Sequence, residues 1–195
     1  AFCPGGLRFV YDDGLFRPGT DTFLLSSLPR LKRGMNVCDL GCGTGGITAL
    51  LADMGYDMVG VDISPEMLMC ARENTYGKDV LLLNQDMRSF ELYGTVQGIV
   101  CSFDTLNYLS NEEELTKTLS LCRLYMEKGG VMVCDINSLY RYEKVYANNA
   151  FVYEVEDDML VWQNEWNSEK EECTFYLTMF TAYEDGYSRE DEVNT

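Results

Sequence analysis

The sequence predicts an α/β protein in which a doubly wound parallel sheet is followed by a C-terminal antiparallel β meander. Over residues 36–147, short apolar runs alternate with amphipathic helical patterns, as in parallel strands joined by right-handed crossovers. After about residue 147, β-rich segments follow one another with only short polar turns between them, which favours hairpins. We therefore expect one domain of 195 residues, divided into an N-terminal arm (1–35), an α/β core (36–147), an antiparallel extension or lid (148–183) and an acidic tail (184–195).

The charge balance bears on the class of partner. The chain has 32 acidic and 15 basic residues, a formal net charge of −17, and residues 143–195 alone hold 14 acids and 3 bases. Nucleic-acid affinity depends on basic side chains that meet phosphates, so a nucleic-acid partner is disfavoured. No run of about 18 apolar residues indicates a membrane span, and no secretory signal is evident. Ala1 in place of Met indicates a trimmed or partial N-terminus.

The eight cysteines predict neither a disulfide framework nor a metal site. They form no C-x-x-C pair and the chain has no histidine, so a zinc site is not expected. Cys38, Cys101 and Cys134 lie inside apolar strand-like runs, where a thiol acts as a small buried hydrophobe. Reduced cysteines favour a cytoplasmic location.

The first strand and the turn after it, residues 36–46, carry the strongest signal. Gly41, Gly43 and Gly46 satisfy G-x-G-x-x-G, the spacing of a Rossmann-like nucleotide loop between a strand and a helix. Asp39 lies two residues before the first glycine, where a carboxylate would repel a pyrophosphate. It suits a ligand that carries positive charge and no phosphate.

The second strand ends in another acid at a fitting distance. Met58–Asp62 is apolar up to Asp62, which lies about 20 residues beyond the glycine loop, where an acid accepts hydrogen bonds from ribose hydroxyls. Ser64, Pro65 and Glu66 then start a helix as N-cap, first-turn proline and dipole-favoured acid. An exposed acid that merely ends a strand is the plainer alternative for Asp62.

Two of these runs resemble motifs of class I S-adenosylmethionine (SAM)-dependent methyltransferases. Asp39-x-Gly41-x-Gly43-x-Gly45 resembles the first motif, and residues 61–68 (Val-Asp-Ile-Ser-Pro-Glu-Met-Leu) resemble the second. The resemblance implies SAM as the cofactor and a methyltransferase domain of the Rossmann-like fold. It places these residues at the cofactor: Tyr11, Asp39, Gly41, Cys42, Gly43, Asp62, Ile63, Asp86, Met87, Ser102 and Phe103.

The resemblance gives several of these residues separate roles. Tyr11 would close over SAM and Ile63 would lie against adenine. Asp86 would meet the exocyclic amine of adenine and the backbone N–H of Met87 its ring, although Asp86 could instead cap a helix. Ser102 and Phe103 would line the methionine end of SAM. Substrate contacts are sought at Asp104, Asn107 and Tyr108, although loop capping explains each equally well.

The acceptor is predicted to be a small molecule. Tyr11-Asp12 resembles a segment of small-molecule methyltransferases, whereas residues 16–25 resemble the segment before motif one in adenine-N6 methyltransferases of tRNA. The latter carry Asn-Pro-Pro and an aromatic after strand four, where this chain has Ser102-Phe103-Asp104, and that favours the small-molecule group. A non-catalytic SAM-binding module, an RNA or protein methyltransferase and a nicotinamide-dependent oxidoreductase stay as alternatives.

The remaining elements complete the expected layout. Ser110 is expected to cap a helix whose buried face holds Leu115, Leu119, Cys122 and Met126, and residues 131–136 to form a fully buried fifth strand. The meander strands are expected at residues 151–155, 159–166 and 173–183. Methyltransferases of this class normally add a helix and two strands, so we expect either a truncated chain or a meander that replaces the sheet edge. No catalytic residue is assigned, although Asp104 or Tyr11 could act as a base, and the oligomeric state stays open.

Overall fold

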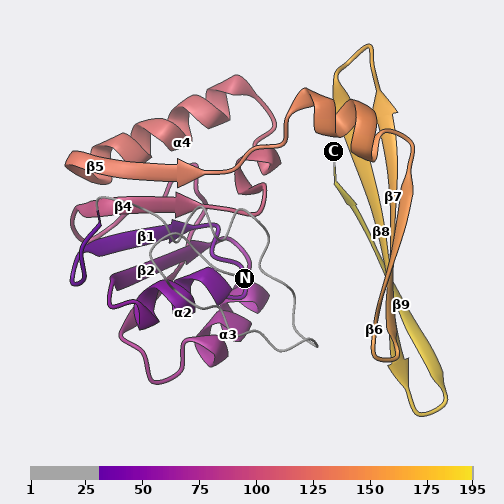
Figure 1. Ribbon diagram of the computed structural model, residues 1–195, viewed down its shortest axis with the longest axis horizontal. Helices are drawn as coiled ribbons and strands as arrows, with labels where there is room; N and C mark the ends of the chain where they lie inside the picture. The colour runs from indigo at the N-terminus through magenta and orange to yellow at the C-terminus, as the bar shows by residue number, and fades with distance from the viewer. Residues whose placement is uncertain (1–30, 195) are drawn as a thin grey trace, which may run out of the picture. The chain divides into compact units, whose positions relative to one another are not determined.

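The computed structural model describes residues 31–194, and these fall into two compact units that we treat separately. The first runs to Ile136 and the second begins at Asn137 (Figure 1). Most of the N-terminal arm, including Tyr11 and the two competing segments, lies outside the described residues. In the described part, no helix is long and apolar enough to span a membrane.

The first unit contains the predicted parallel sheet. Its five strands pair in the order β3-β2-β1-β4-β5, and every pair is parallel. They are β1 (Asn36–Leu40), β2 (Asp57–Asp62), β3 (Val80–Asn84), β4 (Val96–Cys101) and β5 (Met126–Cys134). Because all strands run the same way, the residues that follow them gather at one edge of the sheet, where ligands bind in folds of this kind.

Helices cover both faces of this sheet, which makes it doubly wound. Successive residues of β1 enter different clusters: Val37 packs with Ile47 and Leu51 of α2 (Gly46–Asp53), and Cys38 with Cys122 of α4 (Glu112–Tyr125). This is the period-two alternation of a strand. The helix α3 (Pro65–Asn74) contributes Leu68 and Ala71 to a third cluster, and its N-cap is Ser64 as predicted.

Four details of α4 and β5 differ from expectation. The N-cap of α4 is Asn111, whose side chain accepts the Glu114 N–H, and not Ser110; Leu119 is 41% exposed. Met126 does not belong to the helix but opens β5, which is only partly buried and not the fully buried strand predicted. The reason is its place at the edge: within the described residues, β5 pairs with β4 alone.

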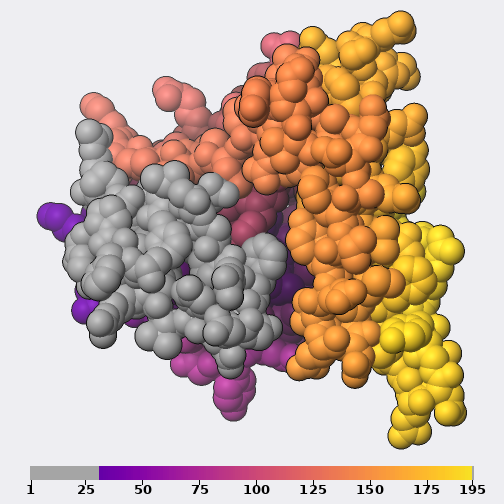
Figure 2. Space-filling model, turned by 45° about the vertical axis from the view of Figure 1, so that its right-hand side comes forward, coloured from indigo at the N-terminus to yellow at the C-terminus, as the bar shows by residue number. Residues whose placement is uncertain are grey.

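The second unit is an antiparallel sheet with a short helix against it. A π-helical segment, η2 (Arg141–Tyr146), precedes the strands, which pair in the order β6-β7-β8-β9. They are β6 (Ala150–Val155), β7 (Asp158–Asn167), β8 (Glu172–Tyr183) and β9 (Gly186–Asn194), coloured orange to yellow in Figures 1 and 2. The meander is therefore confirmed, as a sheet of its own and not as an edge of the parallel sheet.

The last residues are a strand and not the acidic tail predicted for residues 184–195. β9 pairs with β8 over nine residues, from Tyr183↔Gly186 to Phe175↔Asn194. The two-residue turn Glu184-Asp185 reverses the chain, and the acidic strand is held by local partners: Asp191 accepts bonds from Thr178 (2.7 Å) and from Arg189. Paired main-chain groups, which charge patterning does not report, decide the structure here.

An aromatic cluster forms the core of the second unit. Trp162 lies within 5.3–5.8 Å, between ring centroids, of Tyr146, Phe151 and Phe175. Tyr142 stacks on Trp166 from the same helical segment. The register also pairs Trp162 with Leu177. Aromatic rings, which bury large areas, thus hold this small unit together.

Candidate functional site

The glycine loop after β1 is folded back onto β2. The N–H groups of Gly41 and Cys42 both donate to the Val61 carbonyl, at 2.8 and 3.0 Å. Gly41, Gly43 and Gly45 all have positive φ (76°, 51° and 76°), which favours glycine. A Cβ on Gly41 would lie 2.2 Å from the Thr105 methyl, so this position also needs glycine for space.

Gly43, by contrast, borders open space in the described part of the chain. Among residues 31–194, nothing would lie within 4 Å of a Cβ there. Its N–H donates to Asp62 Oδ2 at 2.7 Å, and the Ser64 N–H donates to Asp62 Oδ1 at 2.9 Å. Asp62 thus ties the turns after β1 and β2 together, and each oxygen keeps a lone pair for a further donor.

Asp39 lies buried in β1, just before this loop, with 1% of its surface exposed. The Thr48 hydroxyl donates to its Oδ2 at 2.5 Å, and Oδ1 is buried without a hydrogen-bond partner. Burial raises the pKa of this carboxyl to about 6, and the neighbouring Asp62 adds to the effect. The protein therefore maintains a poorly compensated negative group next to the glycine loop.

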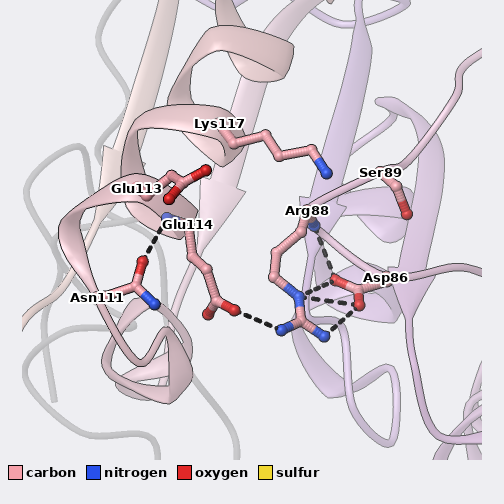
Figure 3. A pocket seen from close by; sticks show the side chains of 7 residues that line it. All are labelled: Asp86, Arg88, Ser89, Asn111, Glu113, Glu114 and Lys117. Carbon is pink, nitrogen blue, oxygen red and sulfur yellow. Dashed lines mark hydrogen bonds and ion pairs between the residues drawn. The ribbon is translucent and has the colours of Figure 1, made fainter.

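After β3, a cavity of about 430 Å³ opens beside the N-terminal end of α4 (Figure 3). Arg88 spans it: Nη2 and Nε bind Asp86, at 2.6 Å and 3.0 Å, and Nη1 binds Glu114 at 2.8 Å. The Arg88 bonds lower the pKa of Asp86 below its usual value. Asp86 is therefore an ionised acceptor held in place, and not a helix cap.

The turn after β4 has an unusual backbone. Phe103 and Asp104 both have φ 59°, in the left-handed region. Their N–H groups donate to the carboxylate of Asp135, which follows β5, at 3.1 and 3.3 Å. Ser102 is buried, whereas the Phe103 side chain is 52% exposed. The turn is fixed by a residue 31 or 32 positions away in the chain.

The other predicted residues differ in what they expose. Ile63 is 62% exposed after β2, available to an adenine face. The Met87 side chain is partly buried against the core, and the role expected of this residue falls to its backbone N–H. Cys42 is buried, with its sulfur 3.0 Å from where a Gly60 Cβ would lie. In the described chain the seven cysteines are free, although Cys134, expected to be buried, is exposed.

Four residues at this edge of the sheet were missed from the sequence. Thr48 binds Asp39, Arg88 holds Asp86, Thr105 packs on Gly41, and Asp135 holds the turn after β4. Only Arg88, two residues from Asp86, had a local signal: a base next to a predicted ligand-binding acid. The other three act across distant parts of the chain.

These features fit SAM. Open space at Gly43 lets a ligand approach the loop, and the buried negative Asp39 disfavours phosphate and favours a cation. Asp62 and Asp86 offer carboxylate oxygens at the ends of neighbouring strands, with Asp62 paired to Asn84 in the register. A sulfonium and ammonium ligand with a ribose and an adenine amine matches this set of acceptors.

Comparisons with known proteins agree. A family model described as a methyltransferase domain matches residues 31–181. YqeM of Bacillus subtilis (strain 168), which carries the name of a methyltransferase, is 28% identical over 194 residues, 97% of this chain and 77% of that protein. The crystal structure of a SAM-dependent methyltransferase from Clostridium acetobutylicum ATCC 824 matches with a TM-score of 0.78 and 28% identity, over 90% of this chain and 71% of that one.

A third match concerns the fold alone. SAM-bound CalS10 is an amino pentose methyltransferase from Micromonospora echinaspora involved in calicheamicin biosynthesis. It is 21% identical and matches with a TM-score of 0.69, over 90% of this chain and 72% of that one. Because nine tenths of the chain is matched, the likeness extends into the second unit. The chain belongs to the methyltransferase-domain family and is a class I SAM-dependent methyltransferase.

Proposed function

We propose that this enzyme transfers the SAM methyl group to a small molecule, and that the acids at the sheet edge hold the cofactor. In this arrangement Gly43 would lie beneath SAM, Asp62 would accept hydrogen bonds from its ribose hydroxyls, and Asp86 would accept one from its adenine amine. The observation that carries the cofactor assignment is the open space at Gly43 next to the fixed Asp62 carboxylate.

Each acid has a support that suits its role. Arg88 keeps Asp86 ionised and oriented, so it accepts hydrogen bonds and cannot donate one. Two backbone N–H groups hold Asp62 in a single orientation. Asp39 stays buried, where its charge acts on a cation through a region of low dielectric.

The cofactor supplies an activated methyl group, and the chain supplies position. Transfer forms a bond between the acceptor atom and the methyl carbon as the bond from that carbon to sulfur breaks. The protein must hold the acceptor in line at near-contact distance. Ser102 and Phe103 follow β4 on the same edge of the sheet as the glycine loop, so we assign them to the methionine end.

A small acceptor is supported by charge and by one relative. Residues 137–195 hold 14 acids against 4 bases, a balance unfavourable for binding a phosphodiester backbone. CalS10, whose likeness to this chain extends into the second unit, acts on an amino pentose. We therefore propose an amine-bearing small molecule as the first class to test. A covering role for the second unit stays a prediction.

The experiment incubates the purified chain and SAM with separate panels of amino sugars, simple amines, alcohols and thiols, and measures S-adenosylhomocysteine release. Parallel reactions contain total RNA or unfolded protein. Release with a small amine, and far less at the same SAM concentration with Gly43→Ala, is the expected result. Release only with RNA or protein would contradict the proposed acceptor class, and release with no acceptor class would favour a SAM-binding module.

A further inference from the structure

The turn after β4 stores backbone strain that something must hold in place. Phe103 and Asp104 are consecutive non-glycine residues at φ 59°. Each such residue costs about 1–3 kcal/mol and persists only where its surroundings fix it. Asp tolerates this region better than an aromatic residue does, so the greater cost falls on Phe103.

Asp135 supplies the fixing contacts. The Phe103 N–H donates to its Oδ2 at 3.1 Å, and the Asp104 N–H lies 3.3 Å from both carboxylate oxygens. Asp135 is itself anchored, because its N–H donates to the Cys101 carbonyl at 3.3 Å, just beyond the β4–β5 pairing. Successive N–H groups that converge on one anion form a recognised anion-binding turn, here filled by a side chain.

The same turn sets the position of Thr105 against the glycine loop. The Thr105 hydroxyl donates to the Ser102 carbonyl at 2.6 Å, which closes the turn. Its methyl group then fills the space beside Gly41, where an added Cβ would lie only 2.2 Å away. The contacts therefore run without a break from Asp135 through the turn and Thr105 to Gly41.

We propose that Asp135 is a positioning residue for the SAM site: it holds the left-handed turn after β4 so that Thr105 supports the glycine loop and Ser102 and Phe103 face the cofactor. Asp135 acts through the turn on SAM binding. The inference rests on the proposed placement of SAM over Gly43, and it does not depend on which acceptor is methylated.

The first measurement is amide hydrogen exchange, resolved by residue. Asp135→Ala removes both acceptors, so the Phe103 and Asp104 amides should exchange at least about tenfold faster while β1 and β4 keep their protection. Asp135→Asn retains one carbonyl oxygen and should be intermediate; it also carries the test if the alanine variant does not fold. Asp158→Ala is the matched control, since Asp158 accepts one backbone N–H, from Ala182, in the second unit.

The second measurement is a double-mutant cycle on affinity for S-adenosylhomocysteine, determined by calorimetry. Asp135→Ala should weaken binding about tenfold, as expected for lost hydrogen bonds to a charged group. Thr105→Ser removes the methyl beside Gly41 and keeps the hydroxyl; it should weaken binding in the wild type but hardly further in Asp135→Ala, because contacting positions are not additive.

Three results would overturn the proposal. Unchanged exchange at Phe103 and Asp104 would show that Asp135 does not hold the turn. Wild-type affinity in both Asp135 variants would show that the turn does not serve the cofactor. Additive losses of affinity from Asp135→Ala and Thr105→Ser would show that Asp135 does not act on the cofactor site through Thr105. None of these measurements uses an acceptor, so failure of the proposed substrate class would leave them standing.

Discussion

The two units of this chain build their cores from different kinds of side chain. The first buries aliphatic and thiol side chains in a parallel sheet covered on both faces, and many of them are nearly inaccessible, such as Val37, Cys38 and Cys101. In the second unit the most buried hydrophobic side chains among the described residues, Tyr146 and Cys173, remain 4% and 6% exposed, and the unit relies on a cluster of aromatic rings. The first unit therefore depends on close fit, and the second on large contact areas.

The units also differ in whether strain and buried charge coincide. The second unit has non-glycine residues at positive φ as well, but Ala147 is half-buried and Glu156 and Glu171 are exposed. In the first unit, Asp39 is buried as an acid and the turn after β4 is left-handed at two residues, and both features lie at the cofactor edge of the sheet. Strain and buried charge at one place are typical of a binding site that the rest of the fold supports. Stability and function should therefore separate under mutation in the first unit. The glycine-loop pair and Asp39 test this, and a pair of variants in the second unit provides the comparison.

The largest effects are expected in the glycine loop. Gly41→Ala places a Cβ 2.2 Å from Thr105 at φ 76°, so it should destabilise the first unit by about 3 kcal/mol or more through overpacking and backbone strain. Gly43→Ala, at φ 51° with no described residue within 4 Å of the added methyl, should cost only about 1 kcal/mol. Its methyl nevertheless enters the space assigned to SAM, and binding should fall about 100-fold.

Urea unfolding and calorimetric titration with SAM distinguish the two variants. Gly43→Ala is the matched partner of Gly41→Ala, because both add the same methyl group at a positive φ. Near-normal SAM affinity in Gly43→Ala would mean that the cofactor does not approach the loop at this position.

A smaller effect is expected in the second unit. Trp162→Ala removes the ring that contacts Tyr146, Phe151 and Phe175, and should lower the free energy of unfolding of that unit by about 3 kcal/mol. The chain has two tryptophans, Trp162 and Trp166, both in this unit, so Trp166 fluorescence in urea reports on it alone. SAM binding by the first unit should survive.

Tyr187→Ala is the control for this substitution. Tyr187 is an aromatic residue of β9 that is 60% exposed, so its loss should change the unfolding free energy by about 0.5 kcal/mol or less. Equal losses in the two variants would show that the aromatic cluster does not stabilise the unit.

Local sequence signals predicted most of the fold. The alternation of apolar runs and helical patterns gave the parallel strands, and the glycine spacing with Asp39 and Asp62 gave the cofactor edge. The errors occur where distant residues decide the outcome. The last residues were interpreted as a tail because they are acidic, but they form β9, which pairs with β8. The burial of β5 was overestimated because its apolar composition does not show that it lies at the edge of the sheet.

The site was predicted less completely than the fold, and for the same reason. The acids that end a strand are visible in sequence because each follows its own apolar run. The residues that orient them are not: Thr48 meets Asp39 from a helix, Glu114 meets Arg88 from another, and Asp135 reaches the turn after β4 from a different strand. Hydrogen bonds between elements depend on the packed structure, and only the groups they support leave a local pattern.

The smallest effect, and the one that most directly separates stability from function, is expected at Asp39. Its pKa of about 6 in the folded protein lies above the ordinary 3.8, so the native state binds this proton more tightly than the unfolded state does. The stabilisation of the native state by this proton is present below pH 4 and is lost as the pH rises towards and past 6. Its loss lowers the free energy of unfolding by about 2–3 kcal/mol at neutral pH. Asp39→Asn removes the charge but leaves an amide group without a partner, so we expect a net gain of about 1 kcal/mol at pH 7.5 and no gain at pH 4.

The affinity for SAM should change with pH in the opposite direction to the stability of the fold. A negative Asp39 favours the cationic cofactor, so wild-type affinity should fall as the pH drops below about 6, whereas Asp39→Asn should bind several-fold more weakly at pH 7.5 and lose this part of the pH dependence. Thermal unfolding and calorimetry at both pH values measure the two effects, with Asp57→Asn, an exposed carboxylate at the start of β2, as control. A variant both less stable and weaker in binding at pH 7.5 would mean that Asp39 supports the fold. A more stable variant with weaker binding would show that the first unit gives up stability to hold a negative group beside its glycine loop.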